Sequence, residues 1–180
     1  MNRINGEPRS SFFGDLILSY YNFSSSFIKQ KGKGIGEPGI LFLVFYCAVA
    51  IFLARLPYQI SLWHVAESKD SFLTVIGVLF FLTIFFVPLL LYLLSMFIHM
   101  ILKCCLGSGT FYDTRLAFFW SLVVASPALL LTGIFKGYFF NSPYINFFDL
   151  PSNVLLVWIL ATMLTNAHSY RSFFPLFVVL

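Results

Sequence analysis

The chain has 180 residues, of which 59% are hydrophobic and 10% are charged, and its mean hydropathy is +0.89. Soluble domains carry charge on about a quarter of their residues, so this composition excludes an ordinary soluble protein and indicates an integral membrane protein. The net charge of +4 is small for a nucleic-acid binder, and three cysteines cannot make a disulfide framework.

The N-terminal part precedes the strongly apolar stretches. Residues 1–11 are polar and are predicted to form a flexible leader, with no signal peptide. Residues 12–33 are predicted to form an amphipathic interfacial helix with one aromatic-rich face and an opposite polar stripe of Asp15, Ser19, Asn22, Ser26 and Lys29. Two interpretations of this segment stay open. It lies in the interface of an anionic leaflet, or it packs against the protein's own helices.

A glycine-rich break follows at residues 32–39 and contains Gly34, Gly36 and Gly39 in a formal G-x-G-x-x-G pattern. No strand precedes it and Pro38 interrupts it, so we interpret it as a hinge and not as a dinucleotide-binding loop.

Four long apolar runs then predict transmembrane helices at about residues 39–56, 72–102, 110–135 and 150–166. Pro57 is expected to close the first of them. A last apolar run at 173–180 is too short to cross a bilayer alone and is either a truncated fifth span or a terminal segment packed on the bundle. The predicted fold class is therefore all-α, an integral membrane helical bundle over residues 39–180.

The distribution of cations predicts a cytoplasmic N-terminus. This orientation places eight of the 11 Lys and Arg residues inside and three outside. The inner set is Arg3, Arg9, Lys29, Lys31, Lys33, Lys103, Arg115 and Arg171, and the outer set is Arg55, Lys69 and Lys136.

The turn between the second and third spans is the best-specified short motif. Thr110 and Asp113 have the spacing of a capping box, and glycines would let the chain turn sharply before it. A purely structural role is one interpretation. The other is a site for a lipid headgroup or a protein partner, formed by Lys103, Gly107, Gly109, Thr110, Asp113 and Arg115.

The third span carries a row of small residues that predicts close helix packing, within the chain or across a dimer: Ala117, Ser121, Ala125, Ala128 and Thr132. Pro88 in the second span and Pro127 in the third are predicted to bend their helices.

Residues suited to catalysis are scarce. His64, Glu67 and Asp70 are too few for a convincing metal site, and Cys104 and Cys105 are soft residues at a helix end. His99 and His168 are expected at the membrane interface. We therefore expect no enzyme activity, no metal and no cofactor.

Several short motifs together resemble the Yip1 domain, most closely its short bacterial members. They are the run from Leu53 to Pro57, the segment Val87 to Tyr92, the stretch Gly107 to Trp120, and Ser126-Pro127, and the likeness extends over residues 12–171. The resemblance implies a compact helical membrane domain, typically of five spans, with a cytoplasmic N-terminus, here in a bacterial inner membrane. The acidic-aromatic N-terminal motif that eukaryotic relatives use with small GTPases is not found in this sequence.

The expected function is membrane organisation or scaffolding through lipid contacts and through a membrane-protein partner or a second copy. The alternative is a small permease or channel for a neutral or lipid-like solute, which would bring together at mid-depth the hydroxyls of Thr83, Ser95, Ser121, Ser126 and Thr132.

Overall fold

The computed structural model describes residues 12–65, 71–104 and 108–168. Within these ranges the chain is all-α, as predicted, and forms no strand. The elements are α1 (Phe12–Tyr21), α2 (Phe23–Gly32), α3 (Glu37–Val65), α4 (Phe72–Cys104), α5 (Phe111–Tyr138), the 3-10 helix η1 (Ile145–Phe148) and α6 (Asp149–Ala167). The predicted leader 1–11 and the predicted partial span 173–180 lie outside the described residues.

Among the described residues, four helical segments are long and apolar enough to cross a membrane: α3, α4, α5, and α6 together with η1. The shortest of the four has 23 residues, which exceeds the roughly 20 that a bilayer requires. The molecule is thus a multi-pass membrane protein, and the part of it that the structure describes has the four spans that the apolar runs predict.

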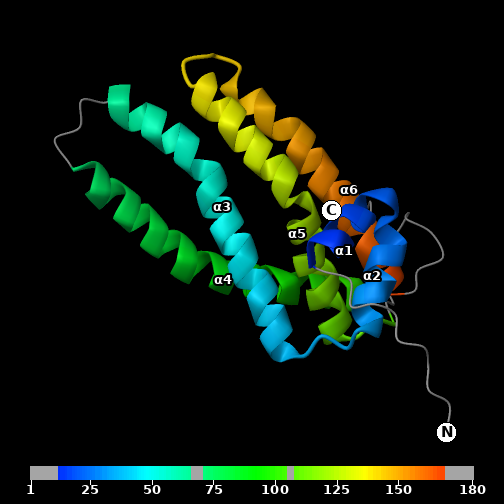
Figure 1. The fold of residues 1–180 in the computed structure, drawn as a ribbon. Helices are drawn as coiled ribbons and strands as arrows, with labels where there is room; N and C mark the ends of the chain where they lie inside the picture. Colours follow the sequence, from blue (N-terminus) through cyan, green and yellow to red (C-terminus); the bar gives the residue numbers. More distant parts are fainter. Residues whose placement is uncertain (1–11, 66–70, 105–107, 169–180) are drawn as a thin grey trace, which may run out of the picture.

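Helix α5 is the centre of the bundle, and α1, α2, α3, α4 and α6 all contact it (Figure 1). In the most apolar stretch of 18 residues within α5, 56% of the residues are buried, whereas in the corresponding stretch of α4 only 6% are buried. The buried part of α5 runs without a break from Leu116 to Ser126 and includes the large side chains of Phe119 and Trp120. The core therefore surrounds the N-terminal half of α5, and α4 turns most of its surface outward.

The prediction that Pro57 ends the first span is wrong. Helix α3 continues through Pro57 to Val65. Proline lacks a backbone N–H, so the Leu53 carbonyl loses its usual helical partner, a loss that membrane helices tolerate when neighbouring groups compensate. One turn after the proline, the hydroxyl of Ser61 lies 3.1 Å from the carbonyl oxygen of Pro57 and 2.8 Å from that of Gly137, and it thereby joins α3 to α5.

Helices α4 and α5 likewise pass through Pro88 and Pro127 without interruption. A bend at either proline stays a prediction.

The prediction of a single amphipathic helix over residues 12–33 is also wrong. Two helices form, and they meet at Asn22, whose backbone is extended. The Asn22 side-chain oxygen caps α2 by accepting a hydrogen bond from Ser25 N at 3.0 Å. Asparagine is a preferred N-cap residue, which explains why the helix restarts here. Gly34, with φ of +59°, then turns the chain from α2 into α3.

Candidate functional site at the start of helix α5

The predicted capping box is confirmed at the N-terminus of α5. The Thr110 hydroxyl oxygen accepts a hydrogen bond from Asp113 N at 3.1 Å, and the Asp113 carboxylate accepts one from Thr110 N at 3.2 Å. The carboxylate also lies at the positive end of the helix dipole, which favours its charge. This geometry fixes where α5 begins.

Asp113 does more than cap the helix, because its second carboxylate oxygen lies 2.9 Å from Nζ of Lys31. The Asp113 side chain is only 7% exposed, whereas the Lys31 side chain is 48% exposed, so the carboxylate is shielded from solvent and the lysine is not. The pair ties the end of α2 to the start of α5. Two segments that sequence reasoning identified separately therefore form one surface.

Arg115 joins α5 to α3. Its two terminal nitrogens lie 3.1 and 2.5 Å from the two carboxylate oxygens of Glu37, and its guanidinium stacks on the ring of Phe111 at 4.8 Å. The Arg115 side chain is only 13% exposed. A bidentate pair of this kind orients both partners, so Arg115 mainly holds the two helices in register.

Gly109 is a point of close approach to the end of α6. A Cβ atom added there would lie 2.6 Å from the carbonyl oxygen of Ala167 and 2.9 Å from the His168 ring. Beside it, the Ser108 hydroxyl donates to the His168 carbonyl at 2.9 Å. The backbone of Gly109 therefore packs directly against the end of α6, with no room for a side chain.

Of the other candidate residues, Lys103 is exposed near the end of α4, and Gly107 lies outside the described residues.

Two histidines meet at the same end of the bundle. The Thr114 hydroxyl lies 2.8 Å from Nδ1 of His99 and 2.9 Å from Nε2 of His168, which joins α4, α5 and the end of α6. His168 is 2% exposed, so its ring is packed inside the protein, and its position at the membrane interface stays a prediction. Burial, with the nearby His99 and Lys103, lowers the pKa of His168 to about 4, against a weaker opposing effect of Asp113. No local motif in the sequence signals this cluster, because its members are far apart in the chain.

Helices α1 and α2 bury three residues of their polar stripe, Asp15, Ser19 and Ser26, whereas Asn22 is exposed. Asp15, 3% exposed, pairs with Lys29 at 3.1 Å and with Lys33, and it accepts a hydrogen bond from Gln30 at 3.2 Å. The hydroxyl of Ser26 accepts a hydrogen bond from the Trp120 indole at 2.9 Å. The sequence left two interpretations of this segment open, and the structure agrees with the one in which it packs against the chain's own helices.

The hairpin of α1 and α2 reaches far along α5. The Tyr20 hydroxyl donates to the carbonyl of Val124 at 2.5 Å, and Val124 lies roughly 20 Å along α5 from its first residue. Outward-facing apolar side chains, from 53% to 85% exposed, cover the opposite side of the hairpin: Ile17, Leu18, Tyr21 and Ile28. The hairpin therefore has the polarity of a segment inserted beside the bundle in lipid, with polar groups toward protein.

The row of small residues on α5 divides at Pro127. Ala117, Ser121 and Ala125 are fully buried, whereas Ala128 and Thr132 are partly exposed. The closest helix contact lies further along, at Gly133 and Gly137, where an added Cβ would be 2.0 Å from the Ala54 carbonyl oxygen and 2.5 Å from Pro57 Cβ. Sequence reasoning missed these glycines, although their spacing of four in an apolar helix is the signal that would have found them.

The hydroxyls considered for a permease mostly bond to their own helices. Ser95, Ser121, Ser126 and Thr132 donate to backbone carbonyls three or four residues earlier, and Thr83 is buried. The weak metal candidate falls partly outside the described residues, which include His64 but neither Glu67 nor Asp70. Among the residues that the structure describes, no group of three or more His, Cys, Asp or Glu side chains could hold a metal ion.

Comparison with models of protein families, with curated proteins and with solved structures finds no match to this chain.

Proposed function

We propose that this chain is a non-enzymatic membrane-organising protein of the Yip1 type, located in a bacterial inner membrane with its N-terminus in the cytoplasm. Its working face consists of the α1–α2 hairpin and the turn from Ser108 to Arg115, and it contacts lipid and a membrane-protein partner or a second copy of the chain. Lys103 stands beside this face as an exposed cation.

The observation that supports the proposal is the ion pair between Lys31 and Asp113, which unites the two halves of the face. Lys29, Lys31 and Lys33 outnumber the two carboxylates with which they pair, so this end of the hairpin keeps a net positive charge that matches an anionic leaflet. The outward apolar side chains of the hairpin match lipid or an apolar partner surface. Arg115 and Gly109 are excluded as probes of binding, because both are committed to internal packing.

Photo-crosslinking in native membranes tests the proposal. A photoreactive amino acid placed at Ile28, 61% exposed on the hairpin, is expected to give a discrete adduct to one membrane protein or to a second copy. The matched control is Val78 on α4, 55% exposed and remote from the hairpin, which should give lipid adducts alone. If Ile28 also gives only lipid adducts, the scaffold interpretation is wrong.

Lys103→Glu provides a second measurement on the same face. Reversing an exposed charge next to an anionic leaflet should weaken the Ile28 adduct without changing the thermal stability of the protein. An unchanged adduct would remove Lys103 from the working face.

A further inference from the structure

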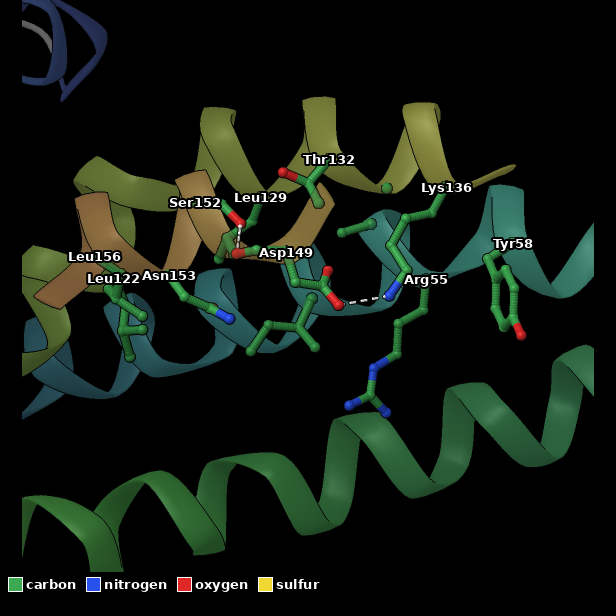
Figure 2. Close-up of a pocket in the computed structure, with 13 residues that line it drawn as sticks. Arg55, Tyr58, Leu122, Leu129, Thr132, Lys136, Asp149, Ser152, Asn153 and Leu156 are labelled. Carbon is green, nitrogen blue, oxygen red and sulfur yellow. Dashed lines mark hydrogen bonds and ion pairs between the residues drawn. The ribbon is translucent and has the colours of Figure 1, made fainter. Parts of the chain in front are cut away.

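A cavity of about 410 Å³ lies between α3, α5 and α6, near the end of α5 and the start of α6 (Figure 2). Residues of all three helices line the cavity, and both α3 and α6 pack on α5. The cavity lies at the end of α5 opposite to the Lys31–Asp113 pair, so an inference about it does not depend on the proposed function. Its volume is within the range of small-molecule sites, about 300–1,000 Å³.

One part of the cavity wall is polar and carries three charged side chains. Lys136 Nζ lies 2.7 Å from the Asp149 carboxylate and 5.8 Å from the centre of the Tyr58 ring. Arg55 points away from this pair in Figure 2, and the structure gives it no ion pair within the described residues. Two cations against one carboxylate leave a net charge of +1 on the wall.

Toward the middle of the bundle the wall is mainly apolar, with Ser152 and Asn153 of α6 as polar residues in it. Leu122 and Leu129 of α5, with Ile51 of α3 and Leu156 of α6, line this part. Leu122 and Lys136 are 14 residues apart on one helix, which separates them by roughly 20 Å. The cavity is thus amphipathic along its length, with its positive charge near the end of α5.

We propose that this cavity binds one anionic phospholipid, with its phosphate on Arg55 and Lys136 and one acyl chain along Leu129 and Leu122. Arg55 is exposed on a bilayer-spanning helix, and a phosphate matches the planar donors of its guanidinium. The net positive charge selects an anionic ligand, and the apolar continuation selects one that carries a hydrocarbon chain.

Native mass spectrometry of the full chain, stripped of lipid in non-ionic detergent and titrated with phosphatidylglycerol, tests this site. One tightly bound lipid per chain is expected, and Arg55→Gln should weaken its binding about tenfold or more, because a charge-assisted contact is lost. Arg55→Lys should retain part of the affinity. His64→Gln is the control, since it changes an exposed side chain of the same helix that does not line the cavity and should leave binding unchanged.

Two further ligands separate the sources of affinity. Diacylglycerol with the same chains lacks the phosphate, and glycerol 3-phosphate lacks the chains, so both should bind at least about tenfold more weakly than phosphatidylglycerol. Leu129→Trp, which fills the apolar part, should lower the affinity for phosphatidylglycerol and diacylglycerol, which carry acyl chains, and leave the affinity for glycerol 3-phosphate unchanged. Equal binding of phosphatidylglycerol and diacylglycerol, equal binding of glycerol 3-phosphate, or an unaffected Arg55→Gln variant would each overturn the proposal.

Discussion

The hydroxyl of Thr114 lies 2.9 Å from Nε2 of His168, and the same hydroxyl lies 2.8 Å from Nδ1 of His99. One threonine thereby connects three helical segments at the end of the bundle where α5 begins. Because Thr114 is fully buried and His168 nearly so, the hydrogen bond between them forms away from water, whereas the one to His99 is partly buried. A buried polar group that loses its partner costs more than the bond itself contributes, so this small cluster holds the helix ends together.

Thr114→Val is therefore expected to destabilise the protein by about 1–3 kcal/mol, since it leaves two imidazole nitrogens without their shared partner. The measurement is the free energy of unfolding in detergent micelles. Thr162→Val is the matched control, because the Thr162 hydroxyl only donates to the Trp158 carbonyl one turn earlier, at a partly exposed site. Equal effects of the two substitutions would contradict a structural role for the cluster.

The stability of the protein should decrease as the pH falls from 6.5 toward 4. The pKa of His168 is lowered to about 4 in the folded state from an ordinary value of 6.5, so between these pH values the unfolded chain binds more protons than the folded one. Thermal unfolding at pH 7 and pH 5 measures this effect. His168→Gln should reduce the difference between the two midpoints, whereas His64→Gln, at an exposed site far along α3, should not.

Gly133→Ala is expected to destabilise the bundle by about 1–3 kcal/mol, because the new methyl group would meet the Ala54 backbone and force α3 and α5 apart. Gly77→Ala makes the same chemical change inside α4, where an added Cβ has no atom within 4 Å. There the substitution should be neutral or should stabilise the helix by up to about 1 kcal/mol. The prediction fails if both variants unfold alike.

Cysteine labelling tests the proposed orientation. Cys104 is exposed at the end of α4, and Cys47 is buried. In a Cys105→Ser background, a membrane-impermeant maleimide should label Cys104 only after cells are permeabilised. Asn141→Cys, in the exposed turn between α5 and η1, should be labelled in intact cells. The opposite pattern would reverse the orientation.

The α1–α2 hairpin illustrates where sequence reasoning stops. The spacing of polar and apolar residues predicts helix here, which the structure confirms, but it does not say whether the polar stripe faces water or protein. Asp15, Ser19 and Ser26 are instead buried. Asp15 pairs with Lys29 and Lys33 at the end of α2, Ser19 donates to the Asp15 carbonyl, and Ser26 accepts a hydrogen bond from Trp120 of α5. In lipid the favourable side for a polar group is the one that offers hydrogen-bond partners, and a local pattern does not say which side that is.

The sequence by itself determined the class of this protein: apolar runs of spanning length require helices in a bilayer, and the spacing of Thr110 and Asp113 required a helix start. Only the tertiary structure decided which helix lies at the centre, that α3 passes through Pro57, and that Arg115 pairs with Glu37 while Arg55 faces an amphipathic cavity. Hydropathy and capping act over a few neighbouring residues and are written in the local sequence. Contacts between Glu37 and Arg115, or between Thr114 and His168, join positions far apart in the chain and exist only once the helices have packed.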